Sequence, residues 1–141
     1  MYGVDYSEAS IEASNKTNAH WIGLGKVEIR HSSVSKLPFA DGMFDLVTAV
    51  ETHFWWANLP GGVREIFRVL KPGGKFIIVA EVYKGANTRM ARMCEKHVPK
   101  TGMTLLDAGE HRELLANAGY EDVQVFEERH KGWICVVGKK A

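Results

Sequence analysis

Short apolar runs rich in β-branched residues alternate with amphipathic stretches along the whole chain, and this alternation restricts the fold more than any other feature. The strand-like runs are residues 3–5, 27–30, 44–50, 75–82, 123–126 and 133–137, and the helix-like stretches are residues 7–18, 62–70, 87–97 and 107–118. Strands that alternate with helices are typical of an α/β domain with a mostly parallel, Rossmann-like sheet. A short turn separates the last two runs, so we expect a C-terminal antiparallel strand pair.

Size and composition indicate one ordinary globular domain over residues 1–141. The hydrophobic fraction is 45% and the charged fraction 25%, and a chain of this length buries a core without disulfide or metal staples. Lys and Arg total 18 against 17 Asp and Glu, so no charge excess attracts nucleic acid or an anionic membrane. The longest apolar run, residues 76–80, is too short to span a bilayer, and no signal peptide is visible.

The two cysteines, Cys94 and Cys135, do not have the spacing of a metal-binding or redox motif. We therefore expect neither a disulfide framework nor a zinc site. The histidines also lack a metal-ligand spacing on one helix face, so no metal is expected. Free cysteines fit a reducing compartment, which predicts a cytoplasmic location.

The carboxyl ends of the strands are the places where a ligand is expected in a sheet of this kind. Asp5 ends the first strand-like run, just before a helix whose N-cap is Ser7. A carboxylate at this position can accept hydrogen bonds from a ribose diol. It can equally be an acid that offsets the dipole of the following helix, and the residue alone does not decide between the two.

An acid, an imidazole and two tryptophans follow the buried run 44–50, namely Glu51, His53, Trp55 and Trp56. This crowding favours a pocket floor with Glu51 or His53 as a general base. The alternative is that the tryptophans cover the core and that Glu51 only approaches the next helix.

Three segments together resemble the class I S-adenosylmethionine-dependent methyltransferases, particularly their small-molecule branch. They are GVDYS at residues 3–7, LPFADGMFDLV at 37–47 and RVLKPGGK at 68–75. Each segment is weak alone, but the last two in this order are specific, and the resemblance covers residues 3–82. It implies a methyltransferase fold, S-adenosyl-L-methionine as the cofactor and a small molecule as the methyl acceptor.

The resemblance also implies roles for individual residues. Asp5 is expected to bind the ribose hydroxyls, and Tyr6 to lie along the adenine face. Ser33 stands where many relatives carry an acid that contacts the adenine amino group, and the N–H of Val34 is expected to face the ring. Glu51 is expected to face the amino-acid moiety and the methyl group of the cofactor.

Family members begin with a strand and a glycine-rich loop ahead of the segment that matches residues 3–7, and we expect a version of the fold that is N-terminally truncated. Residues 23–25 contain two glycines but follow a helix, so they do not replace that loop. The absent strand would be central in the sheet. Its place can be taken by the first strand pairing with run 44–50, by a second copy of the chain, or by a separate polypeptide. A homodimer or local closure is expected, because unpaired buried backbone groups are costly.

Two functions follow. The first is a methyltransferase-like protein that acts on an unknown small molecule. The second, favoured by the absent loop, is a non-catalytic remnant that serves as an interaction or dimerisation module. The basic stretch 84–100 is either a lid over an anionic acceptor or a solvated helix face.

Overall fold

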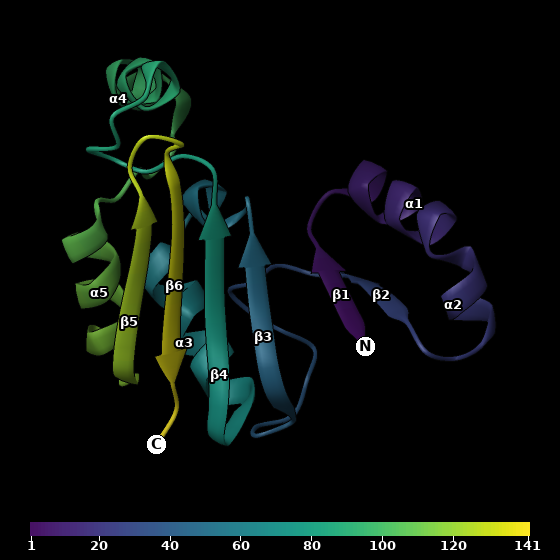
Figure 1. The fold of residues 1–141 in the computed structure, drawn as a ribbon. Coiled ribbons are helices and arrows are strands. Elements are labelled where there is room, and N and C mark those ends of the chain that lie inside the picture. The colour runs from purple at the N-terminus through teal and green to yellow at the C-terminus, as the bar shows by residue number, and fades with distance from the viewer. The chain divides into compact units, whose positions relative to one another are not determined.

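The computed structural model describes residues 1–141, which form two compact units, residues 1–38 and residues 39–141 (Figure 1). Each unit has its own sheet. The sequence-based prediction of one domain stays a prediction.

The first unit is a βαβ arrangement with two parallel strands. Its elements are β1 (Tyr2–Asp5), α1 (Glu8–Thr17), α2 (Ala19–Gly23) and β2 (Glu28–His31). Ser7 caps α1 as expected, because its hydroxyl accepts the N–H of Ser10 at 3.3 Å. In the parallel register Asp5 lies opposite His31. The carboxyl ends of β1 and β2 therefore meet at one edge of this small sheet.

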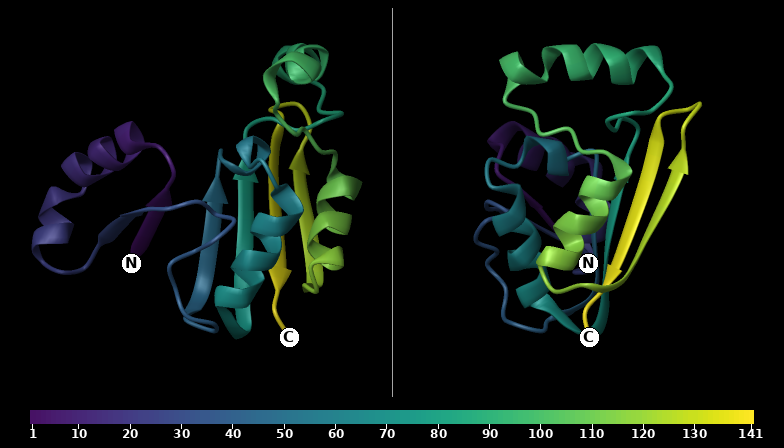
Figure 2. Two further views of the ribbon diagram at one scale, coloured as in Figure 1. Left: turned by 180° about the vertical axis from the view of Figure 1, so that it is seen from behind. Right: turned by 90° about the vertical axis from the view of Figure 1, so that its left-hand side faces the viewer.

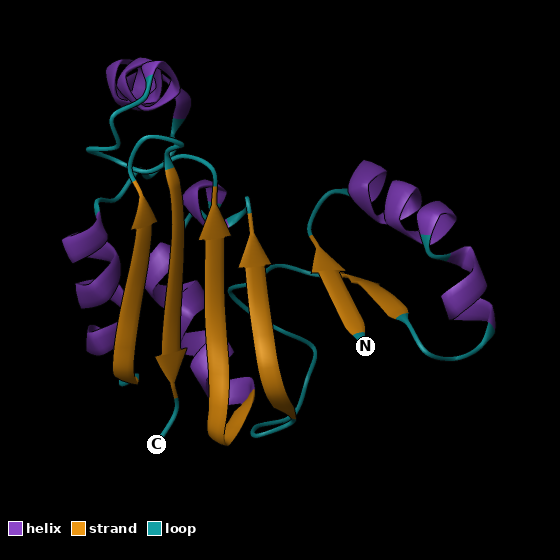
Figure 3. Ribbon diagram, viewed as in Figure 1, coloured by secondary structure: helices purple, strands orange, loops and turns teal.

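The second unit contains a four-stranded mixed sheet with the order β3-β4-β6-β5 (Figure 3). Its strands are β3 (Phe44–Val50), β4 (Leu70–Ala80), β5 (Glu121–Glu128) and β6 (Trp133–Lys139). Its helices are α3 (Leu59–Val69), α4 (Arg89–Thr101) and α5 (Ala108–Asn117), with a 3-10 turn η1 (His53–Trp55). β3 is parallel to β4, and β6 is antiparallel to both of its neighbours. The expected α/β fold with a C-terminal antiparallel strand pair is thereby confirmed, and the sheet that carries this pair is mixed.

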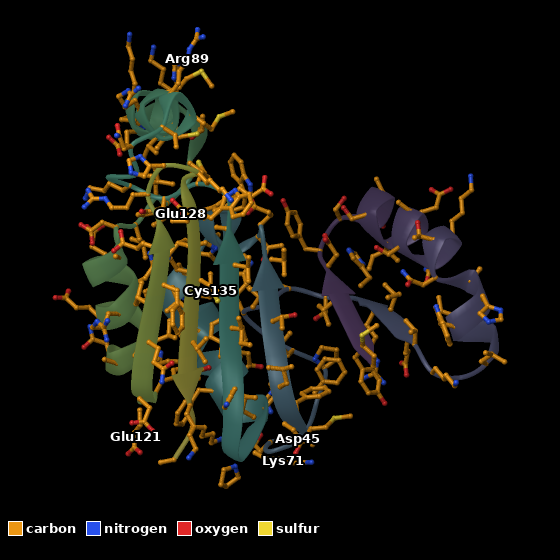
Figure 4. The ribbon with its side chains drawn as sticks, viewed as in Figure 1. Asp45, Lys71, Arg89, Glu121, Glu128 and Cys135 are labelled. Atoms are coloured by element: carbon orange, nitrogen blue, oxygen red, sulfur yellow. The ribbon has the colours of Figure 1, made fainter.

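This topology places the functional loops of the second unit at one edge. Because β6 is antiparallel to β4 and to β5, the strands β3, β4 and β5 all point the same way (Figure 1). Their carboxyl ends share the edge above which α4 lies. Glu128 marks this edge, whereas Asp45 and Lys71, whose side chains form an ion pair at 2.9 Å, lie at the opposite end (Figure 4).

Helices α3 and α5 cover only one face of this sheet (Figure 2). The side chains that point to the helices are buried, among them Phe76, Ile78, Ile134 and Val136. The alternate residues point to the other face, which we call the uncovered face. Its exposed large apolar side chains are Leu46, Val50, Val79, Phe126 and Trp133.

Most element boundaries lie within a few residues of the expected ones, and β4 differs most at its start. The strand begins at Leu70, where the sequence predicts a helix stop and a glycine turn. The glycines lie inside the strand, where its register with β3 shifts, and Gly73 has φ 79°. Their backbone pairs with the C-terminal segment, because Gly73 N–H donates to Lys140 O at 2.8 Å and Lys140 N–H donates to Gly74 O at 2.9 Å.

Four strands have only one neighbour within their own unit. β1 and β2 pair with each other alone, and β3 and β5 are the two outer strands of the second sheet. The strand or partner that the sequence predicts beside β3 stays a prediction. No helix combines the length and apolar character needed to cross a membrane.

Candidate functional site

Asp5 ends β1 and keeps part of its carboxylate free. Its Oδ1 accepts the backbone N–H of Ser7 at 2.8 Å, which fixes the side chain at the start of α1. Its Oδ2 has no hydrogen-bond partner in the structure. Both interpretations of this residue are therefore compatible with its contacts, since one oxygen serves the helix and the other is available to a ligand.

The turn from β1 to α1 is held through the backbone carbonyl of Tyr6, and the Tyr6 side chain takes no part in this contact. The imidazole Nε2 of His31 lies 2.7 Å from the carbonyl oxygen of Tyr6, so this ring nitrogen is the donor. The Tyr6 side chain itself is 71% exposed. An aromatic ring at the carboxyl end of β1 is thus free to stack on a planar ligand.

The turn after β2 supplies an unused backbone donor. The Ser33 hydroxyl accepts the N–H of Ser35 at 3.2 Å, and the Ser33 carbonyl accepts the N–H of Lys36 at 3.1 Å. The N–H of Val34 donates to no group in the chain. The first unit therefore brings Asp5, Tyr6, Ser33 and Val34 to one sheet edge.

In the second unit, Glu51 directly follows β3 and has a left-handed backbone conformation with φ 55°. This conformation is unfavourable for a residue with a side chain. The side chain accepts the backbone N–H of Glu81, which follows β4, so the carboxyl ends of the two parallel strands are joined through one Glu51 oxygen. The other carboxylate oxygen has no partner, and the residue is exposed.

His53 lies inside the second unit, with 1% of its surface exposed. Its Nε2 is 2.9 Å from Nε2 of His111 on α5, and Nδ1 of His111 is 2.7 Å from the carbonyl oxygen of Asp107. Because a carbonyl can only accept, His111 carries its proton on Nδ1, and His53 donates from Nε2. The Nδ1 atom of His53 is then a buried acceptor without a partner.

Burial, and then the nearby His111, lower the pKa of His53 to about 3, and burial also lowers the pKa of His111. Both rings are neutral at pH 7. Glu51, and not His53, is the candidate base that reaches the surface, and the role of either as a base stays a prediction. His111 was not among the predicted site residues. Its only signal in the sequence is its position on the inward-facing side of the helix predicted over residues 107–118.

The two tryptophans that follow His53 lie differently. Trp55 is exposed, and Trp56 is partly buried. The structure holds no group of three or more His, Cys, Asp or Glu side chains placed to bind a metal ion.

Comparison with known proteins identifies the family. Residues 1–78, more than half of the chain, match the family profile described as "Methyltransferase domain". A demethylmenaquinone methyltransferase from Bacillus cytotoxicus is 40% identical over 78 residues, which are 53% of this chain and 31% of that protein. An uncharacterized methyltransferase from Bacillus subtilis is 26% identical over 145 residues, covering 99% of this chain and 70% of that protein.

Solved structures agree on the fold. An S-adenosylmethionine-dependent methyltransferase from Thermotoga maritima superposes with a TM-score of 0.78 at 22% identity, covering 99% of this chain and 72% of that one. The chain thus spans about a third of the Bacillus cytotoxicus relative and larger parts of others. The family resemblance inferred from the three sequence segments is confirmed. The chain belongs to the class I S-adenosylmethionine-dependent methyltransferase family.

Proposed function

We propose that this chain binds S-adenosyl-L-methionine through the carboxyl ends of β1 and β2 and takes part in methyl transfer to a small molecule. The observation that carries the proposal is the pair of unused groups at one sheet edge, the Asp5 Oδ2 oxygen and the Val34 N–H. Membership of the family supports the choice of cofactor.

The residues present fit the adenosine part of the cofactor. A ribose diol needs a strong acceptor, which is the free oxygen of Asp5. An adenine ring needs a planar neighbour and a donor toward its ring nitrogens, which Tyr6 and Val34 offer. Ser33 is a weaker partner for the adenine amino group than an acid, because its hydroxyl is already engaged with Ser35.

When bound, the cofactor supplies an already activated methyl group, so the chain's own task is alignment, which contributes up to about 7–11 kcal/mol in well-oriented reactions. Asp5 and Val34 fix the adenosine end. In the second unit, taken by itself, the free carboxylate oxygen of Glu51 is our candidate proton acceptor, and general-base catalysis contributes about 10²- to 10⁴-fold to a rate. One carboxylate oxygen of Glu51 accepts the N–H of Glu81, and this hydrogen bond fixes the orientation of the side chain and so the position of the free oxygen.

Calorimetric titration with S-adenosylhomocysteine tests the adenosine site. We expect Asp5→Ala to weaken binding about 10- to 150-fold, because a charge-assisted hydrogen bond is lost. Asp5→Asn separates the two duties of the residue, since an amide oxygen still accepts the Ser7 N–H while the amide group cannot accept from a ribose. We expect Asp5→Asn to lose affinity and keep the melting temperature of the unliganded protein.

Glu8→Gln is the matched control, because it removes a neighbouring exposed acid that contacts no proposed ligand group. Equal affinity in the parent protein and in Asp5→Asn would reject the assigned role of Asp5. Absence of any thermal shift at millimolar S-adenosylhomocysteine would reject cofactor binding by this chain.

A second candidate function, an interaction or dimerisation module, is supported by the uncovered face and by the free edge of β3. A large apolar patch beside an unpaired strand edge is typical of a protein–protein contact. We propose a second copy of the chain as the partner.

A further inference from the structure

A hollow of about 560 Å³ lies at the carboxyl edge of the sheet in the second unit. Its lining includes Arg92 and Glu95 on α4, and Arg129 and the imidazole of His130 in the loop after β5. The segment 85–87, which follows β4, forms the rest of the wall. Since β3, β4 and β5 point the same way, the hollow opens at the edge that also carries Glu51.

Both guanidinium groups in the wall keep most of their hydrogen-bonding capacity. Nη1 of Arg92 is 3.3 Å from Oδ1 of Asn87, and Nη2 of Arg129 is 3.3 Å from the carbonyl oxygen of Gly85. Both distances are long for hydrogen bonds, and neither arginine forms an ion pair. Each guanidinium has five N–H donors, so several donors face no acceptor of the chain.

The one acid in the wall does not neutralise both arginines. Oε1 of Glu95 accepts the backbone N–H of Gly85 at 2.7 Å, so this carboxylate braces the loop after β4. Outside the wall, Oε1 of Glu128 accepts the backbone N–H of His130 at 3.3 Å. The lining thus sets two arginines and an imidazole against one carboxylate.

The loops that carry these groups are tied to each other. The N–H of Asn87 donates to the carbonyl oxygen of Arg129 at 2.9 Å, which joins the loop after β4 to the loop after β5. Thr88 caps α4 through a 3.1 Å bond from the N–H of Ala91, which fixes the start of the helix that carries Arg92. Arg92 and Arg129 therefore lie on two segments that hydrogen bonds hold together, and not on a single solvated helix face.

We propose that this hollow binds an oxyanion, a carboxylate or a phosphate, carried by the small-molecule methyl acceptor. Planar guanidinium groups bind both kinds of oxyanion by paired hydrogen bonds, and two of them on one wall favour such a ligand over a neutral one. The assignment of the anion to the methyl acceptor rests on the proposed function, whereas anion binding itself does not.

The test uses two matched pairs of probes, phenyl phosphate with phenol and benzoate with benzamide. Each probe is titrated into the ¹⁵N-labelled full chain, and the amide signals of Gly85, Asn87 and His130 are followed by NMR. We expect the anions to shift these signals saturably and the neutral probes to leave them unmoved. The comparison of phenyl phosphate with benzoate shows which oxyanion the hollow prefers.

The double variant Arg92→Gln/Arg129→Gln should weaken anion binding about tenfold or more, since each lost charged contact is worth that much. Lys96→Gln, an exposed cation on the same helix outside the hollow, is the control and should change affinity less than twofold. Equal shifts from phenol and phenyl phosphate, or equal loss in the control and the double variant, would overturn the proposal.

The same samples separate this inference from the proposed function. S-adenosylhomocysteine is titrated into the parent protein and into the double variant. Anion binding without binding of this cofactor product would leave the anion site in place and reject the proposed function. Cofactor binding without any response to anions would leave the proposed function in place and reject the anion site.

Discussion

Two imidazole rings meet in the core of the second unit, and their burial should make stability depend on pH. His53 is neutral in the folded state because burial lowers its pKa to about 3, from the ordinary value of 6.5. Between these two values the unfolded chain binds more protons than the folded one. Stability is therefore full above pH 6.5 and falls as the pH is lowered, with a slope of up to about 1.4 kcal/mol per pH unit for each proton.

Urea unfolding at pH 7.5, 6.5, 5.5 and 5.0 measures this slope. In the double variant His53→Leu/His111→Leu, which replaces both hydrogen-bonding partners with apolar groups, the slope above pH 5 should become shallower. An unchanged slope in this variant would show that the imidazole pair does not account for the pH dependence.

Chain order alone predicted part of the candidate site at the residue scale. Asp5 and Glu51 were found because Asp5 ends a recognisable strand and Glu51 directly follows one, and both hold these places in the structure. The burial of His53 was not predictable, since its partner His111 is 58 positions away. The free N–H of Val34 was expected only from the family resemblance, because hydrogen bonds that a turn leaves unmade are not visible in a sequence.

Helix α3 is fastened to the turn that precedes β3 by Arg68. Nη1 of Arg68 donates to Oδ1 of Asp41 at 2.6 Å and to the carbonyl oxygen of Phe39 at 2.9 Å. Its Nε and Nη2 atoms donate to the two carboxylate oxygens of Glu65 at 2.9 and 2.7 Å. These acids raise the pKa of the Arg68 guanidinium, with Glu65 as the larger cause.

We expect Arg68→Met to lower the free energy of unfolding by about 1–3 kcal/mol, because several charged hydrogen bonds are lost. Asp41→Ala should cost less than about 1 kcal/mol, since the Asp41 side chain is 82% exposed. Thermal and urea unfolding of both variants measure the difference. A larger loss in Asp41→Ala than in Arg68→Met would contradict this account of the contact.

At the scale of elements, hydrophobic periodicity predicted the type and order of the secondary structure well. β3 was predicted with its observed bounds, because its apolar run is both long and sharply ended. The start of β4 at Leu70 was not, because Leu70 pairs with Phe44 of β3 across a register shift, and such a pairing is not visible in the local sequence. The short helix α2 was also missed, since five residues give too little periodicity to recognise.

The second unit as a whole presents an apolar sheet face to solvent. Val50, Phe126 and Trp133 are 55%, 56% and 47% exposed, and Val50, Val79, Cys135 and Phe126 lie in one row across the four strands. Cys135 stands in the middle of the sheet (Figure 4). Such a row is expected to be covered when a partner is available.

We expect the chain to form a reversible homodimer whose population rises with concentration, as measured by sedimentation velocity. The double variant Val50→Lys/Phe126→Lys places two charges on the uncovered face and should shift the equilibrium to monomer. Glu113→Lys, an exposed substitution on α5, is the control and should leave the dimer intact.

A single sedimenting species of monomer mass at every concentration would reject the dimer. Loss of the dimer in the control as well as in the double variant would show that overall charge, and not this face, controls assembly.

The bare side of β3 has one more consequence. Main-chain amides and carbonyls do not distinguish one extended peptide from another, so the outer edge of β3 in the second unit is a template for pairing with any extended strand. Any partner that covers this edge therefore also protects the chain against cross-β aggregation. The purified chain should aggregate least when it is dilute or when a ligand or partner covers the edge.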